Sequence, residues 1–133
     1  MKADVESARR QMIDQQVRAW DVLDDRVLGV LAEVPRERFV PEAYRDVAFA
    51  DTPIPLGHGQ CMLPPKVEGR ILQALAPGRS DEVLEIGTGS GFFAACLARL
   101  SRHVRTLEID PDLSRDASRV LSDFPVTNVT VET

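Results

Sequence analysis

Residues 82–108 carry the feature that most restricts how this chain can fold. A short strand pattern rich in apolar residues covers 82–86, and glycines follow it at once at alternate positions of 87–91. A helical pattern then covers 92–100, and a second strand pattern covers 103–108. Glycine permits the tight turn that joins a strand to a helix, and it lets a ligand approach the backbone closely. The segment therefore predicts a strand–helix–strand unit with a ligand site at its glycine loop.

The alternation of strand and helix patterns continues beyond this unit. Pro111 suits the first turn of a helix, and helical periodicity follows it to about residue 122. A third strand pattern covers 128–132. Three strands that alternate with helices are typical of a parallel sheet, so we predict an α/β fold for residues 66–133.

Residues 1–65 have a different character. Asp4 is suited to cap a helix that runs from Val5 to about residue 20. Asp24 is suited to cap a second helix over 26–33. We therefore predict a helical N-terminal extension that packs beside the sheet.

Proline dominates the later part of this extension. Pro41 presets the first turn of a short helix over 41–46, and the many chain breakers in 51–65 predict a long loop, functional or mobile. A further helix is expected over 65–76. Its predicted apolar side consists of Val67, Ile71, Leu72 and Leu75.

Composition narrows the class of protein. The chain has 133 residues, 44% hydrophobic and 28% charged, which are values of an ordinary globular domain. Its net charge of −5 argues against a nucleic-acid binder, and no apolar run reaches the length of a membrane span. Cys61 and Cys96 make no disulfide framework, and no Cys/His spacing predicts a metal site. We expect a cytoplasmic protein with no nucleic-acid partner, no membrane partner and no metal.

The acidic residues around the glycine loop indicate which ligand it takes. Glu108 follows Gly89 by 19 residues, the spacing at which a carboxylate receives the hydroxyls of a ribose. Phe92 occupies the place of the third glycine in the dinucleotide pattern G-x-G-x-x-G. Glu85, two residues before the loop, would repel a pyrophosphate but suits a positively charged group. This set favours S-adenosylmethionine, and an NAD-type nucleotide-binding domain is the weaker alternative.

The predicted cofactor-binding residues all lie in or beside this unit. They are Glu85, Gly87, Thr88, Gly89, Ser90, Gly91 and Glu108.

Five blocks of the chain resemble one family. Residues 12–18 (MIDQQVR), 34–41 (VPRERFVP) and 53–60 (PIPLGHGQ) resemble the N-terminal region of protein-L-isoaspartate O-methyltransferases. Residues 83–91 (VLEIGTGSG) and 107–111 (LEIDP) are similar to the cofactor loop and second-strand motif of that family. The glycine loop alone would fit many methyltransferases, whereas the blocks at 34–41 and 53–60 point to this one.

The resemblance implies a fold and a reaction. The fold would be a Rossmann-like, doubly wound and mostly parallel sheet, of which 66–133 hold the first three strands behind the helical extension 1–65. The reaction would move a methyl group from S-adenosylmethionine to the side carboxylate of an isoaspartyl or D-aspartyl residue in a damaged protein, as a step of protein repair. The strand over 83–86 would then lack a neighbour on one side, which predicts a truncated chain or a homo-oligomer that completes the sheet.

The resemblance also implies a substrate loop, and here the chain departs from the family. His58, Gly59 and Gln60 belong to that loop. Leu63 stands at the family's active-site serine, and Cys61 stands at a family threonine. A leucine side chain donates no hydrogen bond and a thiol donates only weakly. A member of the family that binds cofactor but does not transfer methyl groups, or an inactive one, is therefore the alternative to an active enzyme.

Overall fold

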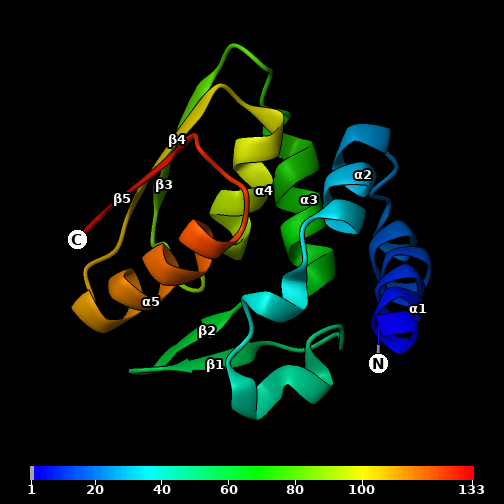
Figure 1. The fold of residues 1–133 in the computed structure, drawn as a ribbon. Coiled ribbons are helices and arrows are strands. Elements are labelled where there is room, and N and C mark those ends of the chain that lie inside the picture. Colours follow the sequence, from blue (N-terminus) through cyan, green and yellow to red (C-terminus); the bar gives the residue numbers. More distant parts are fainter. Residues whose placement is uncertain (1) are drawn as a thin grey trace.

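The structure is a computed structural model that describes residues 2–133. Its C-terminal half is a three-stranded parallel sheet with strand order β3-β4-β5 (Figure 1). The elements are β3 (Glu82–Ile86), α4 (Phe92–Leu100), β4 (His103–Leu107), α5 (Pro111–Asp123) and β5 (Val129–Glu132). The predicted α/β alternation is confirmed, with the second strand ending one residue early and the third beginning one residue late.

The helices lie on one side of this sheet (Figure 1). On that side Val104 and Thr106 of β4 are fully buried, whereas Leu84 and Ile86 of β3 point the other way and are 57% and 74% exposed. Within residues 2–133, β3 pairs with β4 alone. The described part of the chain therefore presents one covered face, one bare face and an apolar edge at β3.

The N-terminal extension begins as an α-helix but does not continue as one. The helix α1 (Lys2–Met12) continues into a π-helical turn η1 (Ile13–Val17) and a 3₁₀ turn η2 (Arg18–Trp20). The prediction that Asp4 caps a helix starting at Val5 is wrong, because the helix starts at Lys2 and Asp4 lies within its first turn. Figure 1 shows α1 at the opposite end of the molecule from β5.

The remaining helices of the extension follow the predictions more closely. The helix α2 (Asp25–Glu33) is capped by Asp24, which accepts a hydrogen bond from Arg26 N at 2.8 Å. Short 3₁₀ turns η3 (Arg36–Arg38) and η4 (Glu42–Val47) follow, so the predicted helix near 41–46 forms as a 3₁₀ helix.

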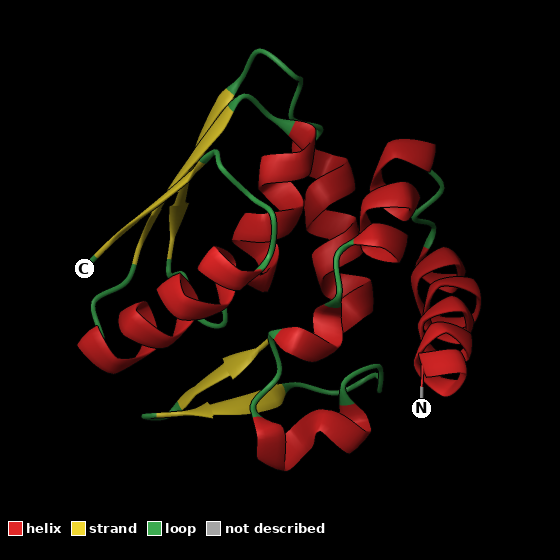
Figure 2. Cartoon of the chain, viewed as in Figure 1, coloured by secondary structure: helices red, strands yellow, loops and turns green. Residues whose placement is uncertain are grey.

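The predicted loop over 51–65 contains an antiparallel hairpin, which the sequence analysis missed. Its strands are β1 (Ile54–Gly57) and β2 (Gln60–Met62), shown below the parallel sheet in Figure 2. Gly57, His58 and Gly59 at the tip all have left-handed backbone, with φ of 88°, 55° and 74°. Prolines and glycines are usually signs of a loop, but here they permit a tight reversal and an edge strand.

The helix α3 (Pro65–Leu75) forms as predicted but buries a different face. Glu68, Gly69 and Leu72 are buried, whereas Ile71 and Leu75 are 41% and 53% exposed. A Cβ at Gly69 would lie 3.1 Å from a methyl of Val17, so the missing side chain lets α3 dock against η1. The predicted apolar side is therefore only partly correct.

Aromatic packing joins the two halves. Phe39, just after η3, contacts Phe92 and Phe124 edge-to-face, with ring centroids 5.8 Å and 6.1 Å away. One cluster of buried apolar side chains runs from Met12 to Phe124. None of the helices in residues 2–133 is long and apolar enough to cross a membrane.

Candidate functional site

Two adjoining cavities lie at the carboxyl ends of β3 and β4, where open α/β sheets bind ligands. The first, the Glu85 cavity, has a volume of about 270 Å³ and lies between α3, the end of β3 and the glycine loop. The second, the Glu108 cavity, has about 510 Å³ and extends to the end of β4. The two cavities share Leu56 and Cys61 of the hairpin and Ile86, Gly87 and Gly89 of the sheet side.

The glycine loop depends on its glycines for two reasons. Gly87, Gly89 and Gly91 have φ of 96°, 57° and 89°, a region that side chains disfavour. A Cβ at Gly87 would meet no atom within 4 Å, so this backbone faces open space that a ligand can fill. A Cβ at Gly91 would lie 3.3 Å from that of Ala117, so this glycine allows α5 to pack closely.

Glu108 ties the glycine loop to the start of α5. Its side chain is buried, and its two oxygens accept hydrogen bonds from Gly89 N at 2.8 Å and Asp110 N at 3.1 Å. The carboxylate also lines the Glu108 cavity. Two backbone donors therefore fix its position, and its remaining lone pairs are available to hydroxyl groups of a ligand.

Glu85 lies in the other cavity and is only partly exposed. Burial raises its pKa to about 7, and the negative charges of Glu68 and Glu108 act in the same direction. The hydroxyl of Thr106 donates to Glu85 at 2.6 Å and opposes this rise. A carboxylate in such surroundings gains most from a ligand that brings a positive charge.

A buried ion pair closes the back of the Glu85 cavity. Arg36 is 1% exposed and Glu68 is 4% exposed, and the guanidinium donates directly to the carboxylate. Arg36 also donates to Ala48 O at 2.7 Å and to Leu63 O at 3.0 Å, and lies 4.9 Å from the centroid of the Phe92 ring. Burial raises the pKa of Glu68 to about 7, and the charge of Arg36 limits that rise. One arginine thus holds the segment after the hairpin against the start of α4.

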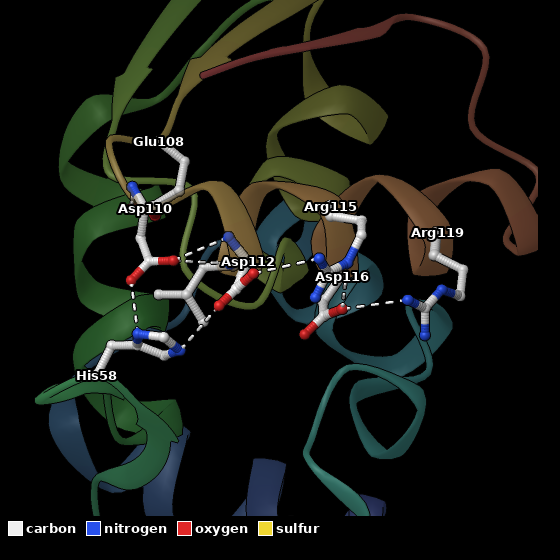
Figure 3. A network of polar contacts seen from close by, with 8 residues as sticks. His58, Glu108, Asp110, Asp112, Arg115, Asp116 and Arg119 are labelled. Atoms are coloured by element: carbon white, nitrogen blue, oxygen red, sulfur yellow. Dashed lines mark hydrogen bonds and ion pairs between the residues drawn. The ribbon is translucent and has the colours of Figure 1, made fainter.

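The hairpin tip contacts the start of α5 through His58 (Figure 3). His58 Nδ1 lies 3.0 Å from Asp110 Oδ2, and His58 Nε2 lies 3.5 Å from Asp112 Oδ2. Asp110 also caps α5 by accepting from the backbone N of Asp112 and Leu113. Arg115 contacts the other oxygen of Asp112 at 3.2 Å.

In the described part of the chain, His58, Asp110 and Asp112 are the one group of three side chains with possible metal-ligand atoms within 4.8 Å of one another. The contacts of His58 with the two carboxylates account for this approach, and we assign no metal to them.

The structure brings most of the predicted site residues together. The Glu85 cavity is lined by Glu85, Gly87, Thr88, Gly89, Ser90, Cys61 and Leu63. Gln60 and Cys61 line the Glu108 cavity together with Glu108. His58, Gly59 and Gly91 line neither cavity.

Three residues of the site were missed by the sequence analysis, namely Arg36, Glu68 and Thr106. Glu68 lies on a helix whose buried side was predicted to be a different, apolar one. Arg36 is one of several charged residues in 34–41, and nothing in the sequence distinguishes it from the others. Thr106 gave no clear signal, because its strand also contains the polar residues His103 and Arg105.

Comparison with known proteins places these observations in a family. The sequence model described as protein-L-isoaspartate(D-aspartate) O-methyltransferase (PCMT) matches residues 7–133. Protein-L-isoaspartate O-methyltransferase 2 of Anaeromyxobacter sp. (strain Fw109-5) is 42% identical over 124 residues, which are 93% of this chain and 51% of that protein. The chain therefore spans about half the length of this curated relative.

Solved structures show the same fold. A putative protein-L-isoaspartate O-methyltransferase of Plasmodium falciparum, in complex with S-adenosyl-L-homocysteine, superposes with a TM-score of 0.77 at 20% identity, over 96% of this chain and 61% of its own. A second protein-L-isoaspartate O-methyltransferase gives a TM-score of 0.79 at 20% identity, over 92% of this chain and 41% of its own.

Proposed function

Because the chain belongs to the protein-L-isoaspartate(D-aspartate) O-methyltransferase family, we propose that it binds S-adenosylmethionine and serves in methyl transfer to isoaspartyl or D-aspartyl side chains of damaged proteins. The observation that carries this proposal is the pair of carboxylates on either side of the glycine loop. Glu85 lies in one cavity and Glu108 in the adjoining one.

The residues fit this cofactor in both cavities. Glu85 would pair with its ammonium group, and Glu108, held by Gly89 N and Asp110 N, would accept from its ribose hydroxyls. The open space over Gly87 leaves room for a ligand against the loop backbone. The Plasmodium falciparum relative, described with bound S-adenosyl-L-homocysteine, supports the same choice.

The chemistry requires little acid–base assistance from the protein. When bound, the cofactor supplies a methyl group on a sulfonium that a carboxylate oxygen attacks, which gives a methyl ester and a neutral thioether. The acceptor carboxylate, with a pKa near 4, is already ionised at pH 7, so no general base is needed. What the chain must do is hold the acceptor in line and stabilise its orientation with hydrogen-bond donors.

The donors at the acceptor side are few. Cys61 and Leu63 line the Glu85 cavity, at positions where the resemblance implies hydroxyl side chains in the family. Ser90 also lines this cavity; its oxygen accepts from Phe92 N at 3.1 Å, and its proton remains available for a ligand. A member that binds the cofactor but transfers methyl groups slowly, or not at all, is therefore the second candidate, and the missing hydroxyls at Cys61 and Leu63 favour it.

Two measurements on the protein separate these candidates. Calorimetric titration with S-adenosylmethionine tests binding, with NAD as the comparison ligand, and methyl transfer to an isoaspartyl peptide tests the reaction. Binding with transfer supports the enzyme; binding without transfer supports the second candidate. A folded protein that shows no heat of binding contradicts both.

A double variant tests the reason for any lack of activity. Cys61→Thr with Leu63→Ser restores both hydroxyls, and transfer should rise at least tenfold if their absence limits the reaction, because one donor at a reacting centre is worth about 10²–10³ in rate. Ile71→Ser, another exposed residue of the same cavity, is the matched control.

Further proposals concern organisation and partners. We propose a helical extension over 1–65 and the first half of a Rossmann-like domain over 66–133, in a cytoplasmic protein. We also propose that the apolar edge at β3, with Leu84 and Ile86 exposed beside it, pairs with a second copy of the chain. Light scattering that finds only monomers at high concentration would contradict that association.

A further inference from the structure

A chain of buried hydroxyl groups leads to Glu85. Thr106, in the middle of the sheet, is fully buried, and Thr88 in the glycine loop is 3% exposed. Their hydroxyl oxygens lie 2.7 Å apart, and the oxygen of Thr106 lies 2.6 Å from Glu85 Oε1. Three side chains from three segments are thus connected in one line that ends in the Glu85 cavity.

The direction of these hydrogen bonds follows from counting protons. A threonine hydroxyl has one proton to donate. An ionised Glu85 can only accept hydrogen bonds, so the Thr106 hydroxyl must donate its proton to Glu85. The contact between the two threonines then requires Thr88 to donate to Thr106. An ionised Glu85 therefore sets the orientation of both hydroxyls, and each donates toward the carboxylate.

We propose that Thr106, supported by Thr88, is a positioning residue that favours the ionised form of the Glu85 carboxylate and directs it into the cavity for the positively charged end of the ligand. The identity of that ligand rests on the proposed function. The effect of the hydroxyl on the ionisation of Glu85 does not, because it is a property of the protein alone.

The surroundings of Glu85 make this hydroxyl important. Burial and the negative charges of Glu68 and Glu108 oppose its ionisation. The one buried cation nearby, Arg36, donates to Glu68 and not to Glu85. The buried thiol of Cys96 on α4, whose pKa burial raises well above its usual value, adds no positive charge. Among the described side chains, Thr106 is the one that donates to Glu85.

A titration of the protein without ligand tests the proposal directly. Protein labelled with ¹³C at glutamate carboxyls is followed by NMR from pH 4 to about pH 10.5, with Glu85→Gln to assign the signal. In Thr106→Val, which keeps the shape and removes the donor, the midpoint of Glu85 should rise by about one to two pH units, the equivalent of a hydrogen bond to a charged group. Thr106→Ser should return it to within a few tenths of a unit.

Controls separate this effect from general damage. Thr130→Val alters an exposed strand threonine whose hydroxyl lies 3.0 Å from the His103 ring, and it should leave the midpoint unchanged. Thr88→Val removes the second donor and should shift the midpoint in the same direction by a smaller amount; it also serves if Thr106→Val does not fold. An unchanged midpoint in the folded variant would overturn the proposal.

Calorimetry then connects the hydroxyl to ligand binding. For Thr106→Val, the affinity for S-adenosylmethionine should fall about tenfold at pH 7, and the difference should shrink as the pH rises toward about 10, where Glu85 is ionised in both proteins. A loss that is equal at every pH would overturn the proposal, since it would mean that the hydroxyl acts on shape alone. Absence of binding in the wild type contradicts the proposed function, while the NMR titration still decides the role of Thr106.

Discussion

The two walls of the site are held in different ways. The sheet wall, residues 82–91 with Glu108, is fixed by backbone hydrogen bonds, such as Gly87 N to Leu107 O at 2.8 Å, and by the buried Glu108. The hairpin wall, residues 54–63, is joined to the rest of the site by side chains, chiefly Arg36 at its base and His58 at its tip. The first wall is therefore intrinsic to the α/β fold, whereas a few substitutions can loosen the second.

The largest effect is expected at the base of the hairpin wall. Arg36→Met leaves Glu68 buried without its partner, which should lower the free energy of unfolding by about 3–5 kcal/mol in urea denaturation. Adding Glu68→Leu should recover most of the loss, because an apolar pair can replace a buried ion pair. Arg102→Met, which breaks the exposed pair with Glu82 at 3.0 Å, is the control and should cost less than about 1 kcal/mol. Equal costs for Arg36→Met and Arg102→Met would contradict the assigned role.

A matched pair of glycines compares the walls directly. Gly91 in the sheet wall and Gly57 in the hairpin wall have nearly the same φ, 89° and 88°. Alanine at Gly57 meets no neighbour, so only backbone strain of about 1–2 kcal/mol is expected. Alanine at Gly91 adds crowding against Ala117, which should raise the loss to about 2–4 kcal/mol. Thermal unfolding of the two variants measures the difference. Equal losses of stability would show that α5 moves to accommodate the added methyl group, so that crowding costs nothing.

The pH dependence of stability tests the sheet wall. Burial raises the pKa of Glu85 to about 7, so between about pH 4.5 and pH 7 the folded state binds more protons than the unfolded state. Stability should therefore fall as the pH rises through this range. Glu85→Gln removes this contribution and should flatten the curve by about 1–2 kcal/mol, less than the full shift because Glu85 is partly exposed.

Glu68 titrates in the same range, so its contribution remains in the Glu85→Gln curve. The comparison of interest is thus the difference between the two curves, measured by urea denaturation at several pH values. A difference that does not change with pH would contradict the raised pKa of Glu85.

The smallest effect is expected at the hairpin tip. His58→Gln removes contacts with Asp110 and Asp112, which are ion pairs when the imidazole is protonated, but His58 is 47% exposed. The free energy of unfolding should fall by about 0.2–1 kcal/mol, and 1 M salt should reduce the difference. A loss above about 2 kcal/mol, insensitive to salt, would mean that the tip is held as firmly as the base.

The same contrast explains what could be predicted from sequence. The strand over 82–86, the helix over 92–100 and the glycine loop are local patterns, and the structure has them at the predicted residues. The spacing of Gly89 and Glu108 predicts a carboxylate near the loop, whereas the hydrogen bond from Gly89 N to that carboxylate was not predicted. The hairpin wall depends on Arg36 meeting Glu68 and Leu63 O, partners that lie 32 and 27 residues away. No periodicity in one sequence reveals such a pairing.

Helix α3 shows why a pattern can fail even locally. Counting apolar residues put Ile71 and Leu75 inside, yet the buried face carries Glu68 and Gly69. Contacts with other segments determine which face is buried: Glu68 pairs with Arg36, and Gly69 packs against Val17. Thr106 was missed for the same reason. Its role comes from the hydrogen bond to Glu85, a residue distant in sequence, and not from its own preference for a strand.

The edge-to-face contacts of Phe39 with Phe92 and Phe124 have a consequence for folding cooperativity. One ring from the extension contacts the first turn of α4 and the end of α5, so neither half keeps its core when the other opens. We expect backbone amides in α2 and in α4 to exchange with solvent deuterium through a common global opening, with similar protection. The segment 1–65 would then behave as part of the domain's folding unit and not as an appendage to it.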